Sequence, residues 1–117
     1  MKKAIYVEDD LNLASAIICI LKTFKINVLH FTSGTDALCE FDRTTTDFVL
    51  LDIKIPGSLD GFDIARIIRS RSQVPILFTT GISEENELSK LLNFSNSDYI
   101  LKPFSMNEFR LRIQKNV

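Results

Sequence analysis

The chain has 117 residues, of which 45% are hydrophobic, and its formal net charge at pH 7 is −1. This length and composition suit one domain with one hydrophobic core and exclude a disordered or collagen-like chain. A net charge so close to zero gives no overall attraction to nucleic acid or to an anionic membrane, so we expect no direct DNA contact from this domain.

Segments with strand composition alternate with segments of helical periodicity along the chain. Ala4–Val7 is a short predicted strand that ends in acids, and Leu11–Phe24 is a predicted helix with Asp10 as its N-cap. The later elements are strands at Ile26–Phe31, Phe48–Ile53, Pro75–Thr79 and Tyr99–Leu101, and helices at Ser33–Phe41, Asp60–Ser70, Ser83–Leu92 and from the capping-box sequence Ser105–Glu108 onward.

Five strands alternating with five helices predict an α/β fold with a parallel sheet covered on both faces. Ligand sites in such folds form beyond the carboxyl ends of the strands, near a reversal of strand order. The residues at these ends are therefore candidates for function. They are Glu8, Asp9 and Asp10 after the first strand, Asp52 after the third, Thr79, Thr80 and Gly81 after the fourth, and Lys102 after the fifth.

The acids in this set predict a site for a divalent cation. Two carboxylates about 4 Å apart repel by about 4 kcal/mol at an effective dielectric constant of about 20, and a cation relieves that repulsion. Mg²⁺ is the natural choice, with Mn²⁺ as a substitute, because Mg²⁺ binds one or two carboxylates and keeps positions for water and phosphate oxygens. Lys102 would attract a phosphoryl group, and the Thr80 hydroxyl could donate a hydrogen bond to it.

The segment after the first strand argues against a nucleotide or flavin site. It carries Glu8, Asp9 and Asp10 where a phosphate-binding loop would need glycine and backbone N–H groups. A carboxylate nucleophile at Asp52 that accepts a phosphoryl group with the help of Mg²⁺ fits the residues better.

No signal peptide is expected, because the apolar run after Lys3 reaches Glu8 too soon. No apolar run approaches the roughly 20 residues of a membrane span, so we expect no membrane contact. Cys19 and Cys39 lack metal-ligand or CxxC spacing and sit among apolar residues, which favours buried free thiols. Together these features predict a cytoplasmic protein.

Four stretches of the sequence, YVEDD, LLDIKIPGSLDG, PILFTTG and DYILKPF, resemble the signature regions of the response-regulator receiver domain of two-component signalling. The likeness covers essentially the whole chain, residues 1–117, in the right order and spacing. It implies the CheY-like, flavodoxin-like doubly wound fold, in which a five-stranded parallel sheet has the order 2-1-3-4-5 and helices cover both faces.

The resemblance implies a role for each matching position. Asp52 resembles the aspartate that accepts the phosphoryl group, Asp9 the carboxylate that binds Mg²⁺ directly, and Glu8 its neighbour that acts through water. The backbone carbonyl of Lys54 would complete the metal site, to which Asp52 also contributes. Lys102 resembles the lysine that contacts the phosphoryl group.

Two further positions resemble the switch of this family. Thr80 matches the switch threonine, because it stands five residues after Pro75 and 22 before Lys102. Tyr99 resembles the aromatic residue that turns inward when this threonine moves, although a half-buried strand tyrosine needs no function.

Phosphorylation in this family usually remodels the surface made by the fourth helix, fifth strand and fifth helix. Asp98 and Arg112 stand where transcription-factor members often place intermolecular ion pairs, which suggests a phosphorylation-promoted homodimer through this surface. The alternative is that they are two ordinary surface charges. His30, at the end of the second strand, is expected to be structural rather than part of a phosphorelay.

The sequence also departs from the family pattern. The loop after Asp52 has one residue more than usual before its Asp60-Gly61 pair, and Gly81 replaces the usual alanine. Lys54 and Ile82 occupy positions that tune how long the phosphoryl group lasts. None of these departures removes a required group.

The leading interpretation is a signalling receiver that takes a phosphoryl group from a sensor histidine kinase onto Asp52. It would catalyse that transfer and its own dephosphorylation without being a conventional enzyme. One alternative is a phosphorylation-independent interaction module, against which the intact acids, threonine and lysine argue. Another is an aspartate-nucleophile phosphatase, which would want a second aspartate where Lys54 stands.

The output of such a receiver stays open. The chain could be a stand-alone single-domain regulator or the receiver of a longer protein with a DNA-binding or catalytic domain. Its resemblance to receivers of OmpR/PhoB-type transcription factors favours the latter, with transcription regulation as the output.

Overall fold

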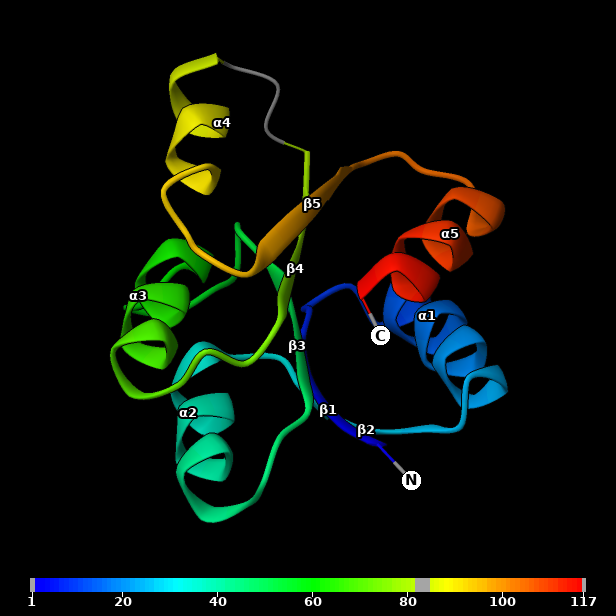
Figure 1. Ribbon diagram of the computed structural model, residues 1–117, viewed down its shortest axis with the longest axis horizontal. Helices are drawn as coiled ribbons and strands as arrows, with labels where there is room; N and C mark the ends of the chain where they lie inside the picture. Colours follow the sequence, from blue (N-terminus) through cyan, green and yellow to red (C-terminus); the bar gives the residue numbers. More distant parts are fainter. Residues whose placement is uncertain (1, 82–84, 117) are drawn as a thin grey trace.

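The computed structural model describes residues 2–81 and 85–116, in which strands and helices alternate (Figure 1). The strands are β1 (Lys2–Val7), β2 (Ile26–Phe31), β3 (Phe48–Asp52), β4 (Ile76–Thr80) and β5 (Ser97–Leu101), and the helices are α1 (Leu11–Thr23), α2 (Gly34–Arg43), α3 (Gly61–Arg71), α4 (Glu85–Leu91) and α5 (Met106–Asn116). Each predicted element is found with small shifts at its ends, although the predicted helix start at Ser83 lies outside the described residues. None of the helices in the described ranges has the length and apolar character needed to cross a membrane.

The strands form one parallel sheet in the order β2-β1-β3-β4-β5, which confirms the predicted fold class. Helices α1 and α5 cover one face of the sheet, and α2, α3 and α4 cover the other (Figure 1). The order reverses at β1, because the chain first adds β2 on one side and then β3 on the other. The carboxyl ends of β1 and β3 therefore meet at the reversal, where ligand sites are expected.

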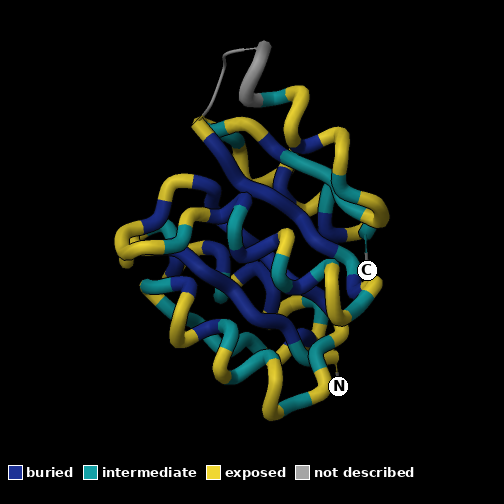
Figure 2. The backbone as a smooth tube through the Cα atoms, turned by 90° about the vertical axis from the view of Figure 1, so that its left-hand side faces the viewer, coloured by how far each residue is buried: buried dark blue, intermediate teal, exposed yellow. Residues whose placement is uncertain are grey.

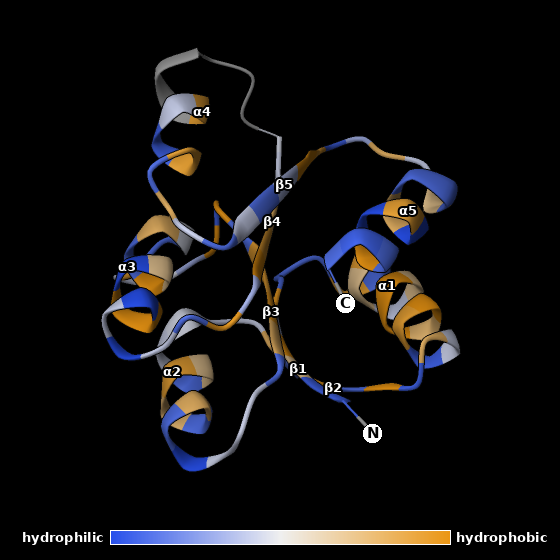
Figure 3. Ribbon diagram, viewed as in Figure 1, coloured by the Kyte–Doolittle hydropathy of each residue, from blue (hydrophilic) through white to orange (hydrophobic). Residues whose placement is uncertain are grey.

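Side-chain alternation along the strands builds a separate core on each face. On β1, Ile5 and Val7 pack in the core under α2, α3 and α4, whereas Ala4 and Tyr6 pack in the core under α1 and α5. All of β3 is buried, because it is central and covered on both sides. Figure 2 shows the buried chain running through the middle of the molecule, and Figure 3 shows that β3 and β4 are strongly hydrophobic.

Side-chain caps fix the loops that follow the strands. The Asp10 carboxylate accepts hydrogen bonds from the N–H groups of Asn12 and Leu13, which confirms it as the N-cap of α1. Asp60 caps α3 in a reciprocal capping box with Asp63. These caps hold the two loops that flank the reversal of strand order.

The two cysteines are free thiols, as expected, but both are exposed, so the prediction that they are buried is wrong. Cys19 lies on the outward side of α1, whose buried residues are Ala14, Ile17, Ile20 and Leu21. Apolar neighbours in the sequence do not surround a helical residue in space, because successive residues point in directions about 100° apart.

Candidate functional site

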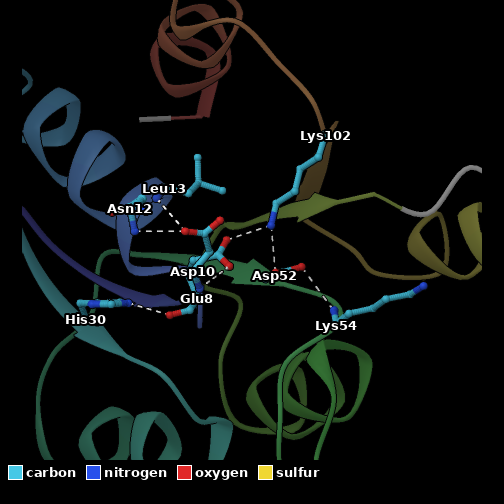
Figure 4. A network of polar contacts seen from close by, with 8 residues as sticks. All are labelled: Glu8, Asp10, Asn12, Leu13, His30, Asp52, Lys54 and Lys102. Atoms are coloured by element: carbon cyan, nitrogen blue, oxygen red, sulfur yellow. Dashed lines mark hydrogen bonds and ion pairs between the residues drawn. The ribbon is translucent and has the colours of Figure 1, made fainter.

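Lys102 joins two buried carboxylates at the carboxyl edge of the sheet (Figure 4). Its Nζ donates to Glu8 Oε1 and to Asp52 Oδ2, and both distances are 2.9 Å. The side chains of Glu8 and Asp52 are only 1% and 7% exposed, whereas that of Lys102 is 25% exposed. The fold thus brings together three predicted site residues from the ends of β1, β3 and β5.

Backbone groups orient the remaining carboxylate oxygens. Asp52 Oδ1 accepts from the N–H of Lys54 at 3.3 Å, and Glu8 Oε2 accepts from the N–H of Asp10 at 3.2 Å. The Nε2 of His30 lies 2.8 Å from the carbonyl oxygen of Glu8, to which its N–H donates. This contact agrees with the structural role expected for His30.

The positive charge of Lys102 does not fully compensate the cost of burying the ionised Glu8 carboxylate. Burial is the main cause that raises the pKa of Glu8 to about 7; the charge of Asp52 adds to it, and the hydrogen bond from Lys102 acts against it. Burial alone would lower the pKa of Lys102, but its hydrogen bonds to Asp52 and Glu8 outweigh burial and raise it. Lys102 therefore stays charged, and a further cation would favour the ionised form of Glu8.

The acids also have the geometry of a cation site. One oxygen from each of Glu8, Asp9 and Asp52 lies within 4.8 Å of the others, and Asp9 is the exposed member. A cavity of about 530 Å³, lined in part by Asp9, Lys54 and Pro56, opens beside them. An all-oxygen donor set with an open side fits Mg²⁺, which keeps several waters.

Mg²⁺ should stabilise the folded protein against urea, because the ion binds the native acid group and not the unfolded chain. At a free Mg²⁺ concentration about 100 times its dissociation constant, the free energy of unfolding should rise by about 2.7 kcal/mol. Asp9→Ala should remove most of this gain, whereas Asp36→Ala, a change at an exposed acid of α2, should keep it. An equal gain in Asp9→Ala and in the unchanged protein would contradict this site.

The two threonines at the end of β4 face opposite sides of the sheet. Thr79 is in register with Asp52, and alternation places it on the side of α1 and α5 with Leu77. Alternation places Thr80 on the other side of the sheet, together with Phe78. Phe78 belongs to the core on that side, and Tyr99 packs against the same core. The predicted switch residues Thr80 and Tyr99 therefore share a face of the sheet.

Asp98 and Arg112 are paired with each other within the chain. Arg112 Nη1 donates to Asp98 Oδ1 at 2.9 Å, and Asn116 Nδ2 donates to Asp98 Oδ2 at 3.2 Å. Burial would raise the pKa of Asp98, but hydrogen bonds from Asn116 and the Tyr99 N–H, with the charge of Arg112, lower it overall. A contact with a second copy would have to exchange this internal pair.

Comparisons with known proteins identify the family of this chain. The protein-family model of the response regulator receiver domain matches residues 4–114 of this chain. The chain belongs to the response-regulator receiver family. Receiver domains of this family bind Mg²⁺ at an acidic pocket and work with histidine kinases in two-component systems; they are not conventional enzymes.

Relatives of this receiver domain include the sensory transduction protein RegX3 of Mycobacterium tuberculosis, 35% identical over 116 residues. The DNA-binding response regulator MtrA of Mycobacterium leprae is 31% identical over 113 residues. The match covers 97% of this chain in both cases, but only 50% of each relative, so the chain spans about half the length of the curated relatives it matches. The BeF3-activated N-terminal receiver domain of Klebsiella pneumoniae RstA is 31% identical, with a TM-score of 0.86 over 98% of this chain and 97% of that chain.

Two residues beside the receiver site were assigned no role from the sequence. Gly61 donates its N–H to the carbonyl of Ile53 at 2.7 Å, and a Cβ on it would overlap the backbone of Asp52 and Ile53. The Asp60-Gly61 pair was the available signal for this close approach. Tyr6 lies buried below Glu8, and its strand composition carried no signal of a polar role.

Proposed function

We propose that this receiver accepts a phosphoryl group from a sensor histidine kinase onto Asp52 and catalyses both this transfer and its own later dephosphorylation, in which water hydrolyses the aspartyl phosphate to phosphate. The observation that carries the proposal is the buried Asp52 carboxylate, held 2.9 Å from Lys102 beside two further acids. A carboxylate nucleophile is activated here by position and by neighbouring charge rather than by a general base.

The chain's own residues have distinct parts in the proposed transfer. A carboxylate oxygen of Asp52 attacks phosphorus, the new O–P bond forms, and the N–P bond of the phosphohistidine breaks. Lys102 and the Thr80 hydroxyl contact the phosphoryl oxygens. Mg²⁺, held by Asp9, Asp52 and the Lys54 carbonyl and through water by Glu8, would neutralise charge on the carboxylates and on the phosphoryl group, and Mn²⁺ would serve in its place.

Phosphorylation would then change the surface formed by α4, β5 and α5. When Thr80 turns toward the phosphoryl group, it leaves space on the face that it shares with Tyr99, and the Tyr99 ring moves inward. This motion would alter the backbone around Asp98, whose pair with Arg112 is exchanged for contacts with a second copy. The proposed result is a homodimer through this surface.

The output is proposed to be transcription regulation by a DNA-binding domain outside residues 1–117. Support comes from relatives that are about twice as long as this chain and include a DNA-binding response regulator. The receiver itself would touch neither nucleic acid nor membrane and would work in the cytoplasm. A stand-alone regulator and a phosphorylation-independent interaction module are the alternatives.

The test is incubation with acetyl phosphate and Mg²⁺, followed by intact-mass measurement and sedimentation. We expect an adduct of about 80 Da, the mass of one phosphoryl group. It should be absent from Asp52→Asn and without Mg²⁺, and present in the control Asp36→Asn. Beryllofluoride with Mg²⁺ should likewise shift tyrosine NMR signals and promote the dimer.

No adduct and no spectral change with either reagent would favour the interaction module. An adduct without any change in sedimentation would retain the phosphorylated receiver and reject the dimer.

A further inference from the structure

The Tyr6 hydroxyl is an unusual group in the core below the receiver site. Tyr6 is completely buried, and its Oη has no hydrogen-bond partner among the residues that the structure describes. Buried tyrosine hydroxyls generally have a partner, because water is lost on burial and nothing else compensates. A buried donor without an acceptor therefore calls for a physical explanation.

The fold places this hydroxyl near the acids. Tyr6 lies on β1, and Glu8, two residues later, directly follows this strand and continues its ladder by donating its N–H to the carbonyl oxygen of Phe31. Alternation therefore directs the Glu8 side chain to the same face as that of Tyr6, the face of α1 and α5. Tyr6 is in register with Leu50, which itself precedes Asp52 by two residues on β3. Its ring centroid lies 5.3 Å from that of His30, on the other neighbouring strand. Tyr6 thus sits one row below Glu8 and Asp52.

The charges around Tyr6 show that its hydroxyl is within electrostatic reach of this group. Burial is the main cause that raises the pKa of Tyr6 well above its usual value. The negative charges of Glu8, Asp52 and Asp10 raise this pKa further. The phenol therefore stays protonated and can act only as a neutral donor or acceptor beside these carboxylates.

Glu8 is the member of the group that would need this donor. Its Oε1 accepts a hydrogen bond from Lys102 Nζ, which also donates to Asp52. Its Oε2 accepts a hydrogen bond from the N–H of Asp10. In the function proposed above, Lys102 turns to the phosphoryl group. The fully buried Glu8 carboxylate then keeps the Asp10 N–H and the metal-bound water of the proposed site but loses its charged donor at Oε1, and a further donor would offset part of that loss.

We propose that Tyr6 is a positioning residue, whose hydroxyl donates a hydrogen bond to the Glu8 carboxylate when Lys102 leaves it for the phosphoryl group. This inference rests on the proposed function. A hydroxyl that is unpaired in the resting state and paired in the phosphorylated state favours the second state, because only a difference in interaction between two states can shift their equilibrium.

The test compares Tyr6→Phe, which removes only the hydroxyl, with Thr46→Val. Thr46 also has a buried hydroxyl oxygen without a partner among the described residues, but it precedes β3 at the opposite end of the strand from Asp52. Calorimetry measures the affinity for Mg²⁺ alone and for beryllofluoride at saturating Mg²⁺. Urea unfolding measures the stability of each metal-free protein.

Tyr6→Phe should weaken beryllofluoride binding roughly tenfold, as expected for a lost hydrogen bond to a charged acceptor. Its Mg²⁺ affinity should stay within about twofold, and its urea midpoint should be equal or higher, because an unpaired buried hydroxyl has been removed. Thr46→Val should bind both ligands as the unchanged protein does. In that unchanged protein, beryllofluoride should also shift the Tyr6 ring ¹³Cζ signal, assigned by its absence from Tyr6→Phe.

Equal beryllofluoride affinity in Tyr6→Phe and the unchanged protein would overturn the inference while leaving the proposed function intact. A parallel loss of Mg²⁺ and beryllofluoride affinity, or the same loss in Thr46→Val, would also overturn it, because either result indicates a general structural defect. No beryllofluoride binding by the unchanged protein would reject the proposed function and the role of Tyr6 with it.

Discussion

Replacing Lys102 by methionine should lower the free energy of unfolding by about 3–5 kcal/mol at pH 8 in the absence of divalent cations. The substitution keeps most of the side-chain volume but removes the ammonium group that lies 2.9 Å from both Glu8 and Asp52. Two buried carboxylates would then face each other without a counter-charge. Urea unfolding of the metal-free protein measures the loss.

The loss in Lys102→Met should shrink as the pH falls to about 5. Glu8 has a folded-state pKa of about 7, above its ordinary value of 4.5, so the folded protein takes up this proton before the unfolded chain does. The cost of the Glu8 charge is therefore fully present above pH 7 and disappears as the pH falls toward 4.5. Without the hydrogen bond from Lys102, the pKa of Glu8 should rise further, and protonation should relieve more of the penalty.

Lys115→Met is the matched control for this prediction. Lys115 Nζ lies 3.5 Å from Asp98, but its side chain is 72% exposed, so its removal should cost about 1 kcal/mol or less. A loss in Lys102→Met that is the same at pH 5 and pH 8, or no larger than that of Lys115→Met, would contradict the buried charge group.

Gly61→Ala should destabilise the receiver by about 1–3 kcal/mol and slow phosphorylation of Asp52. A Cβ at this position would overlap the carbonyl oxygen of Asp52 and the Cα of Ile53, which are backbone atoms that cannot rotate away. The loop must then move, and with it Asp52, the proposed acceptor of the phosphoryl group. Urea unfolding and the initial rate of adduct formation measure the two effects.

Gly81→Ala provides the comparison, because a Cβ on Gly81 has no atom within 4 Å among the described residues. It should be neutral or stabilise the protein by up to about 1 kcal/mol, through the lower entropy of the unfolded chain. Similar stabilities for the two variants would show that the contact at Gly61 relaxes freely.

The edge of the sheet was predictable from the sequence because parallel strands end on the same side. Once Val7, Asp52 and Leu101 are recognised as strand ends, Glu8, Asp52 and Lys102 must gather there, however far apart they are in sequence. The cap at Asp10 was predictable for a similar reason, since it depends on residues two and three positions away.

Contacts that depend on side-chain direction were not predictable. Arg112 could equally have pointed to solvent, and only the packing of α5 beside β5 directs it to Asp98. Cys19 looked buried because apolar residues flank it, yet the helix turns it outward. The Tyr6 hydroxyl lacks a hydrogen-bond partner among the described residues because of how β1 packs between β2 and β3, which no local sequence pattern contains.

The cluster of Glu8, Asp9, Asp52 and Lys102 also sets an order of events. With all four groups ionised, three carboxylates and one ammonium carry a formal charge of −2, which repels an approaching anionic phosphodonor. A divalent cation brings this sum to zero before any phosphoryl group arrives. The receiver would therefore react very slowly with its phosphodonor until a metal ion is bound. Binding of cellular Mg²⁺ would be a required first step of signalling.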